Sequence, residues 1–160
     1  MRVIDIIDGT TVDGPGFRTS IYFAGCLHHC EGCHNPQSWD LDAGREMTVD
    51  EIADAVSRND MDVSLSGGDP MYQAEELLKL CKKLKSDGRN IWLYTGFLYE
   101  ELKKMPMQNA VLDYIDVVVD GPFILDKRDT TLLFRGSSNQ RIIDVKASEA
   151  GEIVLWKSDF

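Results

Sequence analysis

The chain has 160 residues and a mass of 18.0 kDa, and a domain of this size buries about 70% of the surface of its unfolded chain. Its 17 Lys and Arg against 27 Asp and Glu give a formal net charge of −10, which argues against a general nucleic-acid or anionic-membrane binder. No apolar stretch approaches the roughly 18 residues of a membrane span, and Asp5 and Asp8 exclude a secretory signal. We therefore expect a single cytoplasmic domain over residues 1–160.

Short apolar runs alternate with amphipathic segments along the chain, and these patterns predict strands and helices. The predicted strands cover residues 19–24, 63–66, 91–94, 115–119, 142–145 and 152–156. The predicted helices cover residues 48–58, 73–86, 98–105 and 108–114, the first opened by a capping box at Thr48 and Glu51. Alternating strands and helices predict right-handed βαβ units and a parallel sheet. A closed eight-stranded barrel needs about 250 residues, so we expect an α/β fold with an open, partial barrel or a twisted sheet.

Each unusual local sequence comes directly after a predicted strand. These sequences are residues 26–33, which are rich in cysteine, Gly67-Gly68-Asp69-Pro70, Thr95-Gly96 and Asp120-Gly121-Pro122. Parallel strands bring their carboxyl ends to one edge of the sheet, where α/β folds gather their sites. The sequence therefore predicts an active-site rim at this edge.

Three of the four cysteines, Cys26, Cys30 and Cys33, lie within eight residues. Such spacing on one short segment indicates a metal or cluster site rather than a disulfide framework. Three thiolates can reach three corners of an iron–sulfur cluster. The fourth cysteine, Cys81, lies on the apolar face of the predicted helix 73–86, so we expect it in the core.

Two alternatives to a catalytic cluster stay open on spacing alone. A zinc site usually has four ligands, and His28, His29 or His34 could complete one with the three thiolates. We expect His28 and His29 to be solvated loop residues rather than ligands. An electron-transfer ferredoxin would need a fourth thiolate, for which Cys81 is a poor candidate.

The order of the motifs resembles that of radical S-adenosylmethionine (SAM) enzymes, and more closely that of glycyl-radical activating enzymes. The motifs are Asp13-Gly14-Pro15-Gly16-Phe17-Arg18, the C-x3-C-x2-C segment, Ser66-Gly67-Gly68-Asp69-Pro70 and Tyr94-Thr95-Gly96. The short length and residues 134–140 (FRGSSNQ) are similar to the activators of anaerobic ribonucleoside-triphosphate reductase. Many radical SAM enzymes have an aromatic residue at the position of Gly32, where these activators commonly have Gly.

This resemblance implies a fold, two cofactors and a set of site residues. The fold would be an open, partial βα barrel of the radical SAM type with a mostly parallel sheet. Cys26, Cys30 and Cys33 would hold a [4Fe–4S] cluster whose fourth iron is open to the amino and carboxylate groups of SAM. The implied SAM-binding residues are Gly67, Gly68 and Asp69 beside the amino group, and Gly32, Cys33 and His34 around the last cysteine.

The activity that the resemblance implies is that of a radical SAM oxidoreductase. Reductive cleavage of SAM would give a 5′-deoxyadenosyl radical, which would abstract hydrogen from a glycine of the large subunit of anaerobic ribonucleoside-triphosphate reductase. The second implied partner is a low-potential electron donor such as flavodoxin or ferredoxin. The alternatives are an activator of another glycyl-radical enzyme, a small-molecule radical SAM enzyme and a zinc-binding interaction module without catalysis.

Overall fold

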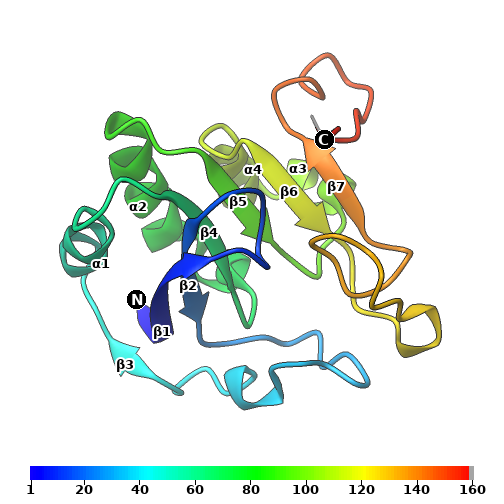
Figure 1. The fold of residues 1–160 in the computed structure, drawn as a ribbon, viewed down its shortest axis with the longest axis horizontal. Coiled ribbons are helices and arrows are strands. Elements are labelled where there is room, and N and C mark those ends of the chain that lie inside the picture. The colour runs from blue at the N-terminus through cyan, green and yellow to red at the C-terminus, as the bar shows by residue number, and fades with distance from the viewer. Residues whose placement is uncertain (159–160) are drawn as a thin grey trace.

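A computed structural model describes residues 1–158, and one seven-stranded sheet runs through them in the order β3-β1-β2-β4-β5-β6-β7 (Figure 1). The strands are β1 (Arg2–Thr10), β2 (Arg18–Phe23), β3 (Arg45–Glu46), β4 (Asp62–Gly67), β5 (Ile91–Tyr94), β6 (Val117–Asp120) and β7 (Arg141–Asp144). The helices are α1 (Val49–Val56), α2 (Ala74–Ser86), α3 (Tyr99–Lys104) and α4 (Pro106–Leu112), and the 3-10 turns are η1 (Pro36–Ser38), η2 (Pro70–Gln73) and η3 (Leu125–Lys127).

The α/β class and the open sheet are confirmed, but the prediction of a mostly parallel sheet is wrong. β2, β4, β5 and β6 pair in parallel, whereas β1 pairs with β2 and β3, and β6 with β7, in antiparallel fashion. A parallel neighbour needs a crossover of about a dozen residues or more, usually helical. The short loop between β1 and β2 and the segment 121–140, whose helical structure is limited to the 3-10 turn η3, provide no such crossover, so the chain returns antiparallel. The radical SAM barrel type stays a prediction.

The four helices cover one face of the sheet. The strands β2, β4, β5 and β6 are neighbours in chain order, and right-handed crossovers place every intervening helix on the same side. The core lies between this face and the helices. Its fully buried members include Ile21, Phe23, Val63, Leu65, Leu93 and Val118 of the strands and Ile52, Leu77, Leu80 and Leu84 of the helices.

The opposite face of the sheet is more polar, because side chains alternate between the two faces along a strand. It carries Ser20 and Tyr22 of β2, Ser64 of β4 and Tyr94 of β5. The loop of residues 11–17 folds across it, and the Asp13 carboxylate accepts a hydrogen bond from Ser20 at 2.9 Å. No helix covers this face in the topology described above, which leaves room for a site.

The structure also corrects the predicted elements at both ends of the chain. β1 and β3 were not predicted, because half-exposed acidic residues interrupt the apolar run of β1 and β3 has only two residues. The predicted strand 152–156 is reduced to an isolated antiparallel bridge between Leu155 and Ile143, flanked by hydrogen bonds from Asp144 N–H to Val154 O at 2.9 Å and from Trp156 N–H to Ile142 O at 2.8 Å. This segment also packs through Trp156, whose ring centroid lies 5.0 Å from that of Trp92. Within residues 1–158, no helix has both the length and the apolarity of a membrane span.

Candidate functional site

The four segments singled out in the sequence meet at the carboxyl ends of β2, β4, β5 and β6. In Figure 1 the light-blue chain after β2 and the gold chain after β6 lie on the same side, at the arrowheads of these strands. A cavity of about 140 Å³ lies at this edge. Its lining includes all three cysteines of the segment 26–33, together with Gly67, Gly68 and Gly96. The prediction that these segments meet at one edge of the sheet is therefore confirmed.

The cysteine loop (residues 26–33) curls through residues with left-handed backbone. His29 has φ 48° and Gly32 has φ 76°. Cys26 is buried, which raises the pKa of its thiol, while Cys30 and Cys33 are half-buried. The loop therefore presents two of its thiols partly to solvent and keeps the third inside.

The sulfur of Cys33 accepts a hydrogen bond from the backbone. The backbone N–H of Asn35 donates to Cys33 Sγ at 3.4 Å. Amide hydrogen bonds of this kind tune the potential of a cluster bound by the sulfur. Within residues 1–158, no three His, Cys, Asp or Glu side chains are arranged around a point where they could hold a metal ion.

The glycine turn (residues 67–69) is pressed against the start of the cysteine loop. A Cβ on Gly67 would lie 2.3 Å from the backbone nitrogen of Phe23, and a Cβ on Gly68 would lie 2.6 Å from the carbonyl oxygen of Gly25. The N–H of Gly68 donates to Phe23 O at 2.7 Å, and the N–H of Asp69 donates to Gly25 O at 2.9 Å. Only glycine allows so close a backbone approach, so the turn and the loop form one unit.

The Asp69 side chain is buried and accepts four hydrogen bonds. Its Oδ1 accepts from the N–H of Met71 at 3.0 Å. Its Oδ2 accepts from Thr95 Oγ1 at 2.9 Å, from the N–H of Gly96 at 2.9 Å and from His28 Nε2 at 2.7 Å. This one carboxylate therefore joins the chain segments that follow β2, β4 and β5.

The expectation that His28 is a solvated loop residue is wrong. Its side chain is only 16% exposed, and it is hydrogen-bonded to Asp69. The spacing of the cysteines carries no signal for this contact, because it depends on where β4 and β5 end. His29 does lie exposed, with its ring stacked on that of Trp39 at 4.6 Å.

A larger cavity of about 510 Å³ opens beside Cys33 and His34. It lies between the loop 11–17 and residues 132–136, and its lining includes Tyr94. The hydroxyl of Tyr94 is buried, has no hydrogen-bond partner within residues 1–158, and burial raises the pKa of this phenol well above its usual value. A neutral donor therefore faces a cavity next to the cysteine loop, a feature that sequence reasoning did not assign.

The two predicted residues beside Cys33 both lie next to the segment after β6. Gly32 is exposed, and a Cβ there would lie 2.8 Å from a methyl group of Leu125. The ring of His34 lies 5.2 Å from that of Phe123. Both neighbours belong to the segment after β6, so this segment closes over the cysteine loop.

The polar run of residues 134–140 is held by its own hydrogen bonds. Gln140 Oε1 accepts from the N–H groups of Gly136 at 2.9 Å and Ser137 at 3.1 Å, and Gln140 Nε2 donates to Gly121 O at 3.1 Å. Arg135 donates to Gln140 O at 2.6 Å. The run therefore shapes the wall of the larger cavity after β6.

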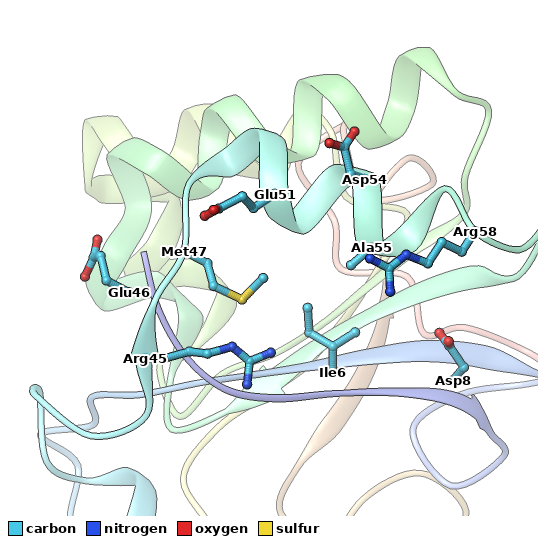
Figure 2. A pocket seen from close by; sticks show the side chains of 9 residues that line it. All are labelled: Ile6, Asp8, Arg45, Glu46, Met47, Glu51, Asp54, Ala55 and Arg58. Carbon is cyan, nitrogen blue, oxygen red and sulfur yellow. The ribbon is translucent and has the colours of Figure 1, made fainter.

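A third cavity, of about 490 Å³, lies away from this edge, between β1, β3 and α1 (Figure 2). Figure 2 shows Arg45 and Arg58 on either side of Ile6 in this groove. Of its acidic residues, Glu51 belongs to the capping box of α1 and Glu46 pairs with the amino terminus. None of the predicted site residues lines it.

Comparisons with known proteins decide the family. A family model described as a 4Fe-4S single cluster domain matches residues 12–143, a range that contains the cysteine loop and the glycine turn. The anaerobic ribonucleoside-triphosphate reductase-activating protein of Escherichia coli (strain K12) is 38% identical over 140 residues, which cover 81% of this chain and 89% of that protein. This chain belongs to the family of anaerobic ribonucleoside-triphosphate reductase-activating proteins.

Two further reductase-activating proteins show the same extent of similarity. That of Vibrio cholerae is 41% identical over 142 residues, 82% of this chain and 90% of its own. That of Haemophilus influenzae is 37% identical over 154 residues, 89% of this chain and 97% of its own. The resemblance drawn from the motifs is therefore confirmed at the level of the reductase-activating family.

Proposed function

We propose that this protein activates an anaerobic ribonucleoside-triphosphate reductase as a radical SAM enzyme, with a [4Fe–4S] cluster on Cys26, Cys30 and Cys33. The observation that carries the proposal is the shared lining of one cavity by the three thiols, the glycine turn and Gly96. Membership of a family of single-cluster reductase-activating proteins supports it.

The residues at this edge fit both cofactors. Three thiols on one short loop match a cluster that keeps one iron for SAM. The backbone at Gly67 and Gly68 carries no side chains, so carbonyl groups there can approach the ammonium group of SAM. The unpartnered hydroxyl of Tyr94 offers a hydrogen-bond donor from the adjoining cavity.

When bound, the cluster supplies the electron that splits the C5′–S bond of SAM into methionine and a 5′-deoxyadenosyl radical, which takes a hydrogen atom from a glycine of the reductase. The chain's own residues bind, orient and shield these groups. The cysteine loop would hold the cluster and the glycine turn would receive the amino group of SAM, while the segment that carries Phe123 and Leu125 covers the loop. Cys33 and His34 line the larger cavity and Gly32 precedes them in the chain, so these three residues would contact the nucleoside of SAM at the inner end of that cavity.

The larger cavity is the proposed route for the glycine of the reductase, because it is the open space that leads past Tyr94 to Cys33. Val12, which lines this cavity, is 69% exposed, and Phe17 and Leu133, in the two segments that flank it, are 69% and 65% exposed. Such side chains suit a protein partner. A low-potential donor such as flavodoxin or ferredoxin can approach the cysteine loop at Leu27 and Glu31, which are exposed.

The test is anaerobic reconstitution with iron and sulfide, followed by SAM and a strong reductant. The 5′-deoxyadenosine formed is measured for the wild type and for Cys30→Ala. Product from the wild type alone supports SAM cleavage at the loop, and a glycyl-radical signal on added reductase then establishes the partner. A wild-type chain that keeps zinc and rejects iron, or that holds a full cluster and gives no product with the reductase present, would sink the proposal.

A further inference from the structure

His28 is the one histidine of the cysteine loop whose ring is built into the fold. Its Nε2 lies 2.7 Å from Asp69 Oδ2. Its ring centroid lies 4.6 Å from that of Phe97, edge to face, and 5.5 Å from that of Tyr72. The imidazole of a loop after β2 thus touches residues that follow β4 and β5.

The hydrogen bond has a defined direction. Asp69 Oδ2 accepts from the N–H of Gly96 and from Thr95 Oγ1, and Thr95 Oγ1 accepts in turn from the N–H of Phe97 at 3.2 Å. The carboxylate is therefore an acceptor throughout, so His28 donates from Nε2. A hydrogen bond to a charged acceptor is stronger than one between neutral groups.

The space for the imidazole depends on a glycine. A Cβ on Gly96 would lie 2.5 Å from Cδ2 of His28, so any side chain there would displace the ring. On the other side, the aromatic rings of Phe97 and Tyr72 limit its movement. The site therefore fixes both the position and the tilt of the ring.

His29 provides the contrast within the same loop. Its ring is exposed and stacks on Trp39. Trp39 lies next to the loop 40–44, outside the segments after β4, β5 and β6 that form the site. It touches neither the glycine turn nor Gly96 in any contact described above. Two adjacent histidines thus differ in whether they join the loop to the rest of the site.

We propose that His28 is a positioning residue that holds the cysteine loop in register with the glycine turn. This inference rests on the proposed function. In that function, the register of the loop and the turn would set the position of the open iron relative to the groups that receive the methionyl part of SAM. His28 lies midway between Cys26 and Cys30, so a shift of its ring moves the part of the cysteine loop that carries these two thiols. His28 itself ligates neither the cluster nor SAM.

The experiment compares three variants of the full chain with the wild type: His28→Ala, His28→Gln and His29→Asn. Gln retains a donor that can reach the place of imidazole Nε2, and Asn tolerates the left-handed backbone of residue 29. Iron and sulfide per chain are measured after reconstitution. The EPR spectrum of the reduced cluster is recorded on samples frozen immediately after SAM is added, so that it reports binding at the open iron before SAM is cleaved.

The proposal expects full iron and sulfide content in all three variants. The SAM-dependent change in the EPR spectrum of His28→Ala should need about tenfold more SAM, as expected for one charge-assisted hydrogen bond. His28→Gln should restore most of the wild-type response, and His29→Asn should match the wild type.

Three results would overturn it: an unchanged SAM response in His28→Ala, loss of the cluster from that variant alone, or no recovery in His28→Gln. The second result would make His28 a support of the cluster itself. Failure of the proposed function gives a different pattern, because the wild type would then show no SAM-dependent change at all. The two failures are therefore distinguishable in one set of samples.

Discussion

Arg141 on β7 holds the buried carboxylate of Asp120 at the end of β6, with its Nε 3.1 Å from Oδ1 and its Nη2 2.5 Å from Oδ2. The same guanidinium pairs with the exposed Glu100 of α3 at 2.7 Å. The N–H of Tyr99, the first residue of α3, also donates to Asp120 at 2.8 Å. Asp120 therefore ties β6, β7 and α3 together beside the site.

Replacing Arg141 by Met should lower the free energy of unfolding by about 3 kcal/mol, because the charge of Asp120 would stay buried without its cation. Anaerobic urea unfolding measures the loss. Glu100→Gln is the control, since it removes only the exposed partner and should lose less than about 1 kcal/mol. Equal losses in the two variants would show that the buried carboxylate does not depend on Arg141.

Gly68→Ala should abolish SAM-dependent activity, because its Cβ would meet the carbonyl oxygen of Gly25 at 2.6 Å and push the glycine turn from the cysteine loop. The control is Gly88→Ala, where the backbone is left-handed (φ 77°), unlike that of Gly68, but the added Cβ meets open space. That variant should lose about 1 kcal/mol of stability and keep its 5′-deoxyadenosine yield. Normal product from Gly68→Ala would contradict the close approach.

Cys81→Ala should keep the iron content of the wild type, because Cys81 is fully buried in the helix-side core, apart from the cysteine loop. Burial also raises the pKa of its thiol to about 12, so it is not a ready thiolate ligand. Loss of the sulfur should lower the free energy of unfolding by about 1 kcal/mol. The measurement is the iron content of Cys81→Ala compared with that of Cys26→Ala, which should lose the cluster. If Cys81→Ala also lost its iron, the assignment of Cys81 to the core would be refuted.

The half-buried phenol of Tyr22 should lower the free energy of unfolding at alkaline pH. Burial, and a hydrogen bond to Asp13, raise the pKa of this phenol to about 12 from a usual value near 10. Above about pH 10 the unfolded chain releases a proton that the folded chain retains, so stability falls as pH rises toward about 12. The fall should be smaller in Tyr22→Phe, measured by urea unfolding at about pH 9 and about pH 11. A tyrosinate absorbance titration should then lack one late-titrating phenol, and an unchanged titration would contradict the shift.

The parallel part of the fold could be predicted from local sequence. The strand 91–94 agrees with β5, and the other predicted parallel strands and the helices agree with the structure to within a few residues. Each combines an apolar run with a local start or stop signal, such as the capping box of α1, whose two hydrogen bonds are present. Of the antiparallel strands, β7 was predicted as the strand 142–145, whereas β1 and β3 were missed because their pairing depends on distant partners rather than on their own patterns.

The residues of the site were predictable in kind, but their contacts were not. Spacing, and a place directly after a strand, are enough to predict Cys26, Cys30, Cys33 and the glycine turn. The contacts of His28 and Tyr94 cannot be predicted in this way, since one depends on the carboxylate of Asp69 and the other on a cavity formed by the segment after β6. SAM contacts at Gly32 and His34 stay predictions.

By itself, the sequence determined the α/β class, the edge of the sheet that carries the site, and the three thiols, because these depend on periodicity and spacing within short segments. Only the tertiary structure decided that the sheet is mixed, that His28 is enclosed, and that Asp69 joins three strand ends. The physical reason is the same in each case. Pairing, burial and hydrogen bonds between residues far apart in the chain exist only once the strands lie side by side.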